Sequence, residues 1–274
     1  MATYLDHAAT TPMRRSAIDA MAPFQDVVYA NPSGSHRFAR EARKAIDEAR
    51  DDVASVIGCK PGEVIFTSGG TEGDNAAIVG AITKHGGIAV CSSAEHHAVL
   101  HCVEHHGGSV VPTTTSGTID LQALENVLAT ATTKVSVVSV MAVNNEVGSI
   151  TPLRDVARIV REHAPDAVLH TDAVQAACWV DLAEIAPLVD VLTLSSHKFG
   201  GPKGMGVMMQ RSGIELDPLI LGGGQERDRR SGTHNVAGIV ATAVALRETS
   251  ESRVEETERV TKLRDRLEIG RAHV

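Results

Sequence analysis

The sequence is poor in aromatic residues, in cysteine and in long apolar runs, and each shortage excludes a class of protein. Only 3% of its 274 residues are aromatic, so the core has to be built from Ala, Val, Ile and Leu. Four scattered cysteines without a CxxC pair favour reduced thiols in a cytoplasmic protein over disulfides. No apolar run is long enough to cross a bilayer. The N-terminus has no basic segment followed by an apolar one, so we expect neither a membrane span nor a signal peptide.

Charge and length narrow the class further. Hydrophobic residues make up 43% of the chain and the formal net charge is -8. This acidic, soluble globular balance gives no reason to expect a nucleic-acid partner. The length predicts one large domain, or one domain plus part of another, with ample material for a core.

Short apolar segments alternate along the chain with segments of helical periodicity. We expect strands at residues 64–66, 87–91, 109–111, 134–140, 167–169, 191–194 and 205–209. We expect helices at residues 14–24, 37–57, 74–83, 120–129 and 153–163, another that ends near 106, and a helical region from about 236. This alternation predicts an α/β fold with a mainly parallel sheet. In such sheets ligands bind beyond the carboxyl ends of the strands.

One of these strands ends in an unusual run of polar residues, Ser195, Ser196, His197 and Lys198. Burial favours the neutral form of a lysine, and a neutral amine is a nucleophile that can form a Schiff base with a carbonyl. An isolated lysine at this place is more often an ordinary surface residue. Asp172, at the end of the preceding apolar strand, favours the functional interpretation. A lysine Schiff base and an aspartate that pairs a pyridinium nitrogen are the two parts that a pyridoxal phosphate site needs.

A glycine turn between a strand and a helix is the candidate phosphate site. The run 67–72, Thr-Ser-Gly-Gly-Thr-Glu, follows the first expected strand, and the free N–H groups of a helix start there would favour an anion. The alternative is an ordinary helix cap by Ser68 or Thr71. The residues that follow expected strands, and so share one sheet edge, are Gly70, His96, Asn145, Asp172 and Lys198.

Two further groups of residues have competing interpretations. His97, His101 and His105 share one helical face, but no cysteine or carboxylate completes a metal set, so we expect a solvated polar face and no metal site. His96 differs, because at a strand-to-helix junction its ring can face a ligand. The glycine- and arginine-rich segment 222–233 is either flexible surface or a clamp on an anion.

Six segments resemble, in the family order, the motifs of the pyridoxal phosphate-dependent cysteine desulfurases among the class V aminotransferase-like enzymes. They are residues 4–12 (YLDHAATTP), 66–72 (FTSGGTE), 143–148 (VNNEVG), 172–175 (DAVQ), 195–198 (SSHK) and 230–233 (RSGT). The match spans nearly the whole chain. It implies the large domain of a fold type I enzyme, with a seven-stranded sheet flanked by helices, in a homodimer that binds pyridoxal 5′-phosphate.

The resemblance also implies a role for each matching residue. Lys198 would hold the cofactor covalently, Asp172 would keep its ring nitrogen protonated, and Gln175 would bond the ring hydroxyl. His96 would stack on the ring and, with Lys198, form the catalytic pair. The remaining roles are phosphate binding by Gly70, Thr71, Ser195 and His197, contact with the other subunit's cofactor phosphate by Thr233, and contact with the substrate carboxylate and ring hydroxyl by Asn145.

The family pattern also sets expectations about what is absent. Members run to roughly four hundred residues, so we expect a C-terminal truncation that removes the sulfur-accepting cysteine loop and the small C-terminal domain with its carboxylate-binding arginine. Cys59, Cys91, Cys102 and Cys178 lie in helix or strand patterns and are interpreted as packing residues. The expected division is an arm at 1–13, a cofactor domain at 14–246 and a linker-helix start at 247–268. Residues 269–274 match a common sequencing adapter read in frame, so we expect a non-native tail; the alternative is a natural end with Gly270 as helix cap.

The expected activity is therefore that of a cysteine desulfurase. Such an enzyme converts L-cysteine to L-alanine and passes the sulfur through an enzyme cysteine to an acceptor or scaffold protein, for iron–sulfur cluster or thiocofactor assembly. Two alternatives stay open at this point. One is a selenocysteine lyase or another class V aminotransferase, and the other is a fragment that binds the cofactor and catalyses nothing.

Overall fold

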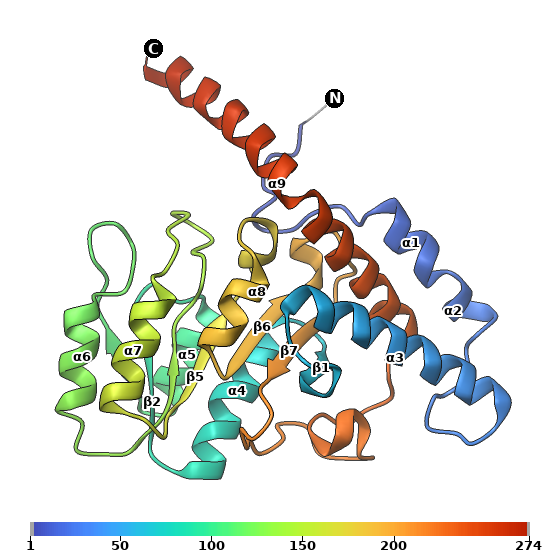
Figure 1. The fold of residues 1–274 in the computed structure, drawn as a ribbon, viewed down its shortest axis with the longest axis horizontal. Coiled ribbons are helices and arrows are strands. Elements are labelled where there is room, and N and C mark those ends of the chain that lie inside the picture. Colours follow the sequence, from blue (N-terminus) through green and yellow to red (C-terminus); the bar gives the residue numbers. More distant parts are fainter. Residues whose placement is uncertain (1–2, 273–274) are drawn as a thin grey trace.

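The computed structural model describes residues 3–272, with side chains described through residue 268. Among these residues seven strands form one sheet in the order β1-β7-β6-β5-β4-β2-β3 (Figure 1). The strands are β1 (Val64–Thr67), β2 (Ile88–Ser92), β3 (Ser109–Val111), β4 (Val135–Ser139), β5 (Val168–Asp172), β6 (Val191–Ser195) and β7 (Gly206–Gln210). Only β7 runs antiparallel to its neighbours, β1 and β6, and the other pairs are parallel. The predicted α/β fold with a mainly parallel sheet is confirmed.

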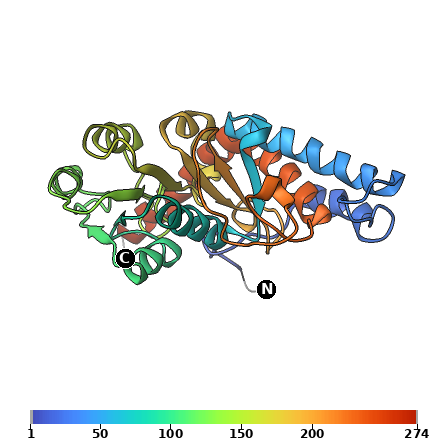
Figure 2. The same cartoon turned by 90° about the horizontal axis from the view of Figure 1, so that it is seen from below.

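Helices cover both faces of the sheet and make three layers (Figure 2). One face packs against α4 (Gly70–His85) and α5 (His97–His105). The other face packs against α1 (Arg15–Met21), α3 (Arg37–Ile57), α6 (Leu121–Ala129), α7 (Leu153–His163), α8 (Leu182–Ile185) and α9 (Val236–Ala272). Because both faces are covered, the strands have little contact with water, as is usual for parallel sheets.

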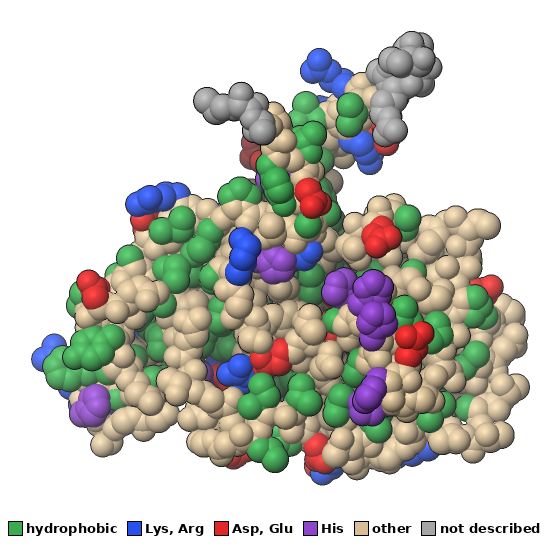
Figure 3. Space-filling view, turned by 180° about the vertical axis from the view of Figure 1, so that it is seen from behind, with side chains coloured by type: hydrophobic (Ala, Val, Ile, Leu, Met, Phe, Trp, Pro, Cys, Tyr) green, Lys and Arg blue, Asp and Glu red, His purple; other side chains and the backbone are tan. Residues whose placement is uncertain are grey.

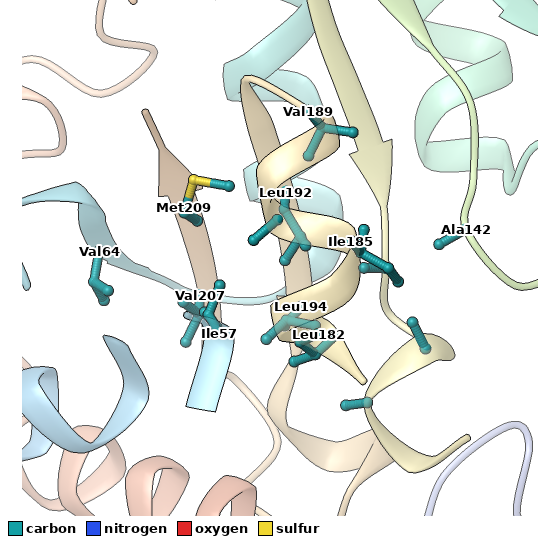
Figure 4. Packing of buried hydrophobic residues seen from close by; sticks show 14 of the residues in the cluster. Ile57, Val64, Ala142, Leu182, Ile185, Val189, Leu192, Leu194, Val207 and Met209 are labelled. Carbon is teal, nitrogen blue, oxygen red and sulfur yellow. The ribbon is translucent and has the colours of Figure 1, made fainter. Parts of the chain in front are cut away.

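Alternate residues of each central strand face opposite helical layers. Leu192 and Leu194 of β6 belong to the larger core cluster together with Leu182 and Ile185 of α8, and Figure 4 shows these side chains gathered around β6 and β7. Burial of a leucine of this size contributes about 1.5–3 kcal/mol. Val191 belongs instead to the cluster on the α4 side. Because successive side chains alternate, the polar residues Thr193 and Ser195 of β6 lie on the same face as Val191, toward α4.

Two expected helices differ in the structure. The segment expected as one helix over 14–24 is broken into α1 and α2 (Pro23–Asp26), because Pro23 lacks an N–H and starts a helix more readily than it continues one. Helix α4 begins at Gly70, four residues before the expected start. The expected helix over 37–57 is confirmed as α3, which ends at Gly58. Cys59 lies in the turn after α3 rather than in a helix or strand, and Cys178 lies in a 3-10 turn.

Helix α9 runs beyond the sheet and projects from the body of the molecule (Figure 1). The expected boundary between residues 246 and 247 falls inside this continuous helix, so the division into domains stays a prediction. The side chains of the expected non-native tail at 269–274 lie outside the described residues, as do residues 273 and 274 altogether. Within the described part of the chain, no helix has the length and apolar character needed to span a membrane.

Candidate active site

Strand alternation places a row of polar side chains on the face that α4 covers. In β5 the apolar Val168 packs on the α4 side, so His170 and Asp172, two and four residues further on, share that face. In β6 the same spacing from Val191 puts Thr193 and Ser195 on the α4 side. Both strands are parallel and in register from His170 opposite Val191. Their carboxyl ends therefore present polar groups to the start of α4.

A cavity of about 270 Å³ lies at this edge of the sheet, near the lower end of the range for small-molecule sites. The structure brings nine of the ten predicted site residues to its wall: Gly70, Thr71, His96, Asn145, Asp172, Gln175, Ser195, His197 and Lys198. Thr233 is exposed and does not line the cavity. The five residues that the strand-end argument placed at one sheet edge, Gly70, His96, Asn145, Asp172 and Lys198, therefore line one cavity, while the roles of all ten residues stay predictions.

Lys198 ends η4 (Ser196–Lys198), the 3-10 turn that follows β6. Its Nζ donates hydrogen bonds to the backbone carbonyl oxygens of Ala8 at 2.6 Å and Ala9 at 3.0 Å, so the N-terminal arm lies against the lysine. Burial lowers the pKa of Lys198, and the carboxylates of Asp172 and Asp6 only partly oppose this effect. The lysine amine is therefore neutral more often than that of a free lysine.

Asp172 is buried at the end of β5. Its Oδ1 accepts a hydrogen bond from the N–H of Val174 at 2.8 Å. Burial raises the pKa of Asp172, while this bond and the nearby His96 and Lys198 lower it. A buried carboxylate with a cationic partner available is a group that can hold a protonated ring nitrogen.

The first turn of α4 is open toward the cavity. The helix has Gly69 at its N-cap and no side-chain cap, so the alternative of an ordinary cap by Ser68 or Thr71 is wrong. The N–H of Ser68 instead donates to Glu72 Oε2 at 2.9 Å. A Cβ built on Gly70 would lie 2.7 Å from Val174 Cγ2, which explains a glycine here. The uncapped N–H groups of a 16-residue helix favour an anion.

The other cavity residues have local contacts of their own. His96 is the N-cap of α5, and its Nδ1 accepts from the N–H of Ala98 at 3.1 Å. Gln175 Nε2 donates to the carbonyl of Ala8 at 2.8 Å. His197 Nδ1 is paired with Thr10 Oγ1 at 3.0 Å, and burial, followed by Lys198 and Lys203, lowers the pKa of His197. Two of these contacts again involve the N-terminal arm.

The two adjacent asparagines after β4 have different surroundings. Asn144 Oδ1 accepts from the N–H groups of Glu146 and Val147, both at 2.9 Å, so its side chain holds the turn. Asn145 lines the cavity. The simple turn interpretation therefore applies to the first asparagine and not to the second.

The histidine-rich helix shows no metal arrangement. Histidine side chains gather on one face of the molecule (Figure 3), and the rings of His97 and His101 stack with centroids 4.4 Å apart. Among the described residues, no group of three or more potential ligands is arranged to hold a metal ion.

The arginine-rich loop is not free to clamp an anion with Arg230. Its guanidinium forms a two-point ion pair with Glu72, with Nε to Oε1 at 2.8 Å and Nη2 to Oε2 at 3.1 Å. This pair joins the loop to the first turn of α4. The loop is instead a structural neighbour of the candidate phosphate site.

Sequence reasoning missed several cavity residues, namely Ala9, Asp74, Met141, Val143 and Val174. Asp74 is the only acid among them, and it is 1% exposed. Its single sequence signal is the spacing of four from Gly70, which puts both residues on one face of a helix.

Comparison with known proteins gives a consistent family. The family model described as aminotransferase class-V matches residues 3–269. Cysteine desulfurase IscS of Dictyoglomus turgidum is 43% identical over 96% of this chain, which spans 67% of that protein. A solved structure of a NifS-like protein superimposes with a TM-score of 0.93 at 36% identity, over 100% of this chain and 76% of the other. The structure described as SspA in complex with cysteine matches with a TM-score of 0.82 at 37% identity, over 89% and 72%.

These similarities cover both the family motifs and the fold that carries them, over about two thirds of the length of the IscS relative. The cofactor of these relatives is pyridoxal 5′-phosphate, as the lysine and aspartate at the strand ends predicted. The chain belongs to the class-V aminotransferase family, in the branch of the IscS- and NifS-like cysteine desulfurases.

Proposed function

We propose that this cavity binds pyridoxal phosphate on Lys198 and receives L-cysteine, as in a cysteine desulfurase that converts cysteine to alanine. The observation that carries the proposal is the convergence of Lys198, Asp172 and the uncapped start of α4 on one cavity. These groups offer an amine for the aldehyde, an anion for the ring nitrogen and N–H donors for the phosphate. The residues present therefore fit the cofactor at both of its ends.

Bound there, pyridoxal phosphate supplies an electron sink for the bonds at the substrate α-carbon. The protein's part is to position groups and to move protons. Lys198 would be the attachment point, and its lowered pKa favours the neutral amine, the form in which Nζ acts as a nucleophile and as a base. The carbonyl oxygens of Ala8 and Ala9 accept hydrogen bonds from Nζ and would bind the amine whenever it is not bonded to the cofactor.

The remaining roles are those that the family resemblance implies, and the positions of these residues in the cavity wall are compatible with them. Asp172 would stabilise a proton on the ring nitrogen, and Gln175 would bond the ring hydroxyl. Gly70, Thr71, Ser195 and His197 would surround the phosphate. His96, fixed by its bond to the N–H of Ala98, would lie over the ring and exchange protons with the substrate. Asn145 would contact the substrate carboxylate.

The substrate assignment is supported by the relatives. Several are named cysteine desulfurases, and the similar SspA structure is described as a complex with cysteine. We further propose a homodimer in which exposed Thr233 reaches the partner's cofactor phosphate. We also propose a sulfur-acceptor or scaffold protein as partner, a place in iron–sulfur cluster assembly, and a cytoplasmic location in keeping with four free thiols.

The test is to locate the cofactor chemically. Purified chain mixed with pyridoxal phosphate is reduced with borohydride and mapped by peptide mass spectrometry. We expect the adduct on Lys198, its loss in Lys198→Ala, and its retention in Lys203→Ala, a matched neighbour five residues away. Cysteine added before reduction should prevent fixation, because a bound amino acid competes for the aldehyde. An adduct on Lys203, or one that cysteine does not displace, would refute the proposal.

A further inference from the structure

A buried polar cluster lies directly beneath the cavity, between α4 and the strands. Thr193 Oγ1 of β6 donates to Asp74 Oδ1 of α4. His170 Nε2 of β5 lies 3.4 Å from Thr193 Oγ1 and 3.5 Å from Asp74 Oδ1. On its other side, His170 Nδ1 is 2.8 Å from Ser139 Oγ of β4. The cluster therefore joins one helix to three neighbouring strands.

One neutral form of the histidine satisfies this chain of hydrogen bonds. With its proton on Nε2, His170 donates a hydrogen bond to Thr193 Oγ1 and accepts one at Nδ1 from the Ser139 hydroxyl. The Thr193 hydroxyl in turn donates a hydrogen bond to Asp74 Oδ1. Burial lowers the pKa of His170 to about 3, so the imidazole is uncharged at neutral pH. The ring cannot then serve as a cationic partner for Asp74.

Asp74 and Asp172 are both buried, and burial raises the pKa of both carboxyls, but the partners of the two groups differ. Burial, and next the charge of Asp172, raise the pKa of Asp74 well above its usual range, and only the Thr193 bond opposes them to any extent. Asp172 has the Val174 N–H, His96 and Lys198 to favour its charged form. Because the two charges repel each other and Asp74 has fewer partners that favour its charged form, Asp74 is the first of the two to take up a proton.

The cluster lies where α4 approaches the strands most closely. A Cβ on Gly73, the residue before Asp74, would lie 2.8 Å from Thr193 Cγ2. A Cβ on Gly70, one turn earlier, would lie 2.7 Å from Val174 Cγ2. The glycines therefore let the start of α4 approach β6 and the residues after β5 closely, and the Asp74–Thr193 bond joins the helix to β6 at this point.

We propose that Asp74 is a positioning residue for the cofactor. As an uncharged acid bonded to Thr193, it fixes the phosphate-facing turn of α4 against β5 and β6, and it leaves the negative charge at the cavity floor on Asp172. This inference rests on the proposed function, because it concerns how the phosphate-binding turn of α4 is positioned relative to Asp172, the proposed partner of the ring nitrogen. Asp74 acts through Thr193 and α4, without taking part in the chemistry itself.

The first test is the pH dependence of stability in Asp74→Asn, an isosteric and permanently neutral change. The sign follows from linkage: a carboxyl with a raised pKa must gain a proton on folding, and this lowers the stability of the wild type increasingly as pH rises from the unfolded value of about 4 toward the folded value. Urea unfolding between pH 5 and 9 should show Asp74→Asn at least as stable as wild type, with an advantage that grows with pH. The other titratable groups that face Asp74, unchanged in both proteins, are His170, Asp172, Glu95 and Cys102.

The second test measures cofactor binding in the full chain. Thr193→Val removes the hydroxyl and keeps the shape, so we expect the dissociation constant for pyridoxal phosphate to rise about fivefold, as for one lost hydrogen bond. Asp74→Asn should remain within about twofold of wild type, and exposed Thr83→Val on the same helix serves as the matched control. The pH dependence of the bound cofactor's absorption spectrum should be unchanged in Asp74→Asn and shifted in Asp172→Asn, because only the second change removes a charge that favours a protonated ring nitrogen.

Two results would overturn the inference. One is an Asp74→Asn protein destabilised by the same amount at every pH, which requires a charged Asp74. The other is Thr193→Val with unchanged cofactor affinity. Failure of the wild type to fix cofactor on Lys198 would instead contradict the proposed function, so the two failures are distinguishable.

Discussion

At the scale of single residues, the site depends on which buried carboxyl keeps its charge. Glu95 is buried, with Oε1 accepting from the N–H of Met141 at 2.8 Å and no hydrogen-bond partner for Oε2 among the described residues. Burial raises the pKa of Glu95 well above its usual range. Burial therefore favours the uncharged form of both Glu95 and Asp74. Of the three acids, Asp172 has the most partners that favour its charged form, namely the Val174 N–H, His96 and Lys198.

This argument predicts a specific defect for Asp172→Asn. The amide keeps the shape and leaves the phosphate end intact, so cofactor binding should fall by only a few-fold. An amide cannot hold the ring nitrogen protonated, so the rate of the cysteine-dependent absorbance change should fall by about 10²-fold or more, as for the loss of one preorganised electrostatic partner. Stopped-flow absorbance with cysteine measures the rate.

Glu95→Gln is the matched control, because it replaces a neutral group by another neutral group at a similar depth. Its rate should stay within a few-fold of wild type. If Glu95→Gln lost as much rate as Asp172→Asn, the assignment of the charge to Asp172 would be wrong.

The sequence was informative about the residues at strand ends and silent about those beneath them. Lys198, Asp172 and Gly70 follow apolar runs, and the rule that parallel strands end at one edge brings them together. Asp74 and Glu95 acquire their properties from burial by other elements, and no local pattern records that. From the sequence, Asp74 is only the polar first residue of the helix expected at 74–83.

At the scale of elements, the loop before α9 is held in a strained conformation. Within η5 (Gln225–Asp228), Glu226, Arg227 and Asp228 have φ values of 48°, 60° and 63°, and each such residue costs about 1–3 kcal/mol. Glu226 is bound by buried Arg50 through two contacts of 2.8 and 2.7 Å. It also accepts from the Phe66 N–H at 3.0 Å and pairs with His234 at 2.9 Å. These contacts stabilise the strained turn and join it to α3 and β1.

We predict that Glu226→Gln destabilises the chain by about 3 kcal/mol at neutral pH. Burial alone would raise the pKa of Glu226, but Arg50, His234 and the Phe66 N–H together lower it to about 2. A lowered carboxyl pKa stabilises the fold above the unfolded value of about 4.5, and this contribution disappears as pH falls toward 2. The difference in unfolding free energy should therefore be full above pH 5 and shrink below it.

Urea unfolding over pH 3–7 measures this difference. Glu256→Gln removes an exposed pair with Arg259 and should change stability by less than about 1 kcal/mol. A Glu226→Gln penalty that stayed constant down to pH 3 would contradict the assigned ion pair.

Elements were predictable where one local signal dominates. Helix α3 has an uninterrupted apolar face and a glycine at its end, and its bounds were predicted correctly. The first helix was not, because Pro23 divides a segment that otherwise reads as continuous. The turn at Glu226 has no glycine at residues 226–228, where φ is positive, so the tertiary contacts of Glu226 with Arg50, Phe66 and His234 explain it.

At the scale of the whole molecule, α9 links the body to a projecting surface. Val254, Leu263 and Leu267 are 67%, 50% and 67% exposed on a helix that extends beyond the sheet (Figure 1). Its first half packs on α1 and α3. The candidate cavity, by contrast, is lined by residues of the N-terminal arm, the start of α4 and the ends of β5 and β6. Under the proposed function, cofactor binding by these residues and the later transfer of sulfur can therefore be tested separately.

The last prediction concerns that separation. None of the four cysteines lines the cavity. Burial is the main cause of a raised pKa in each of them, to about 11 in Cys59 and Cys178 and about 12 in Cys91. Thiolates are the attacking species in sulfur chemistry, and a nucleophile has to reach the substrate sulfur in line.

We expect the chain to bind cysteine at the cofactor that Lys198 holds. We expect it nevertheless to form no persulfide on any of its four thiols and to release little sulfide. Persulfide-specific labelling with mass spectrometry, beside a sulfide assay with dithiothreitol, measures both. Lys198→Ala gives the background, and single Cys→Ala variants should leave the residual rate unchanged. A persulfide on Cys178, the thiol 3.5 Å from the Lys198 carbonyl, would show that this chain carries its own sulfur acceptor and would overturn the prediction.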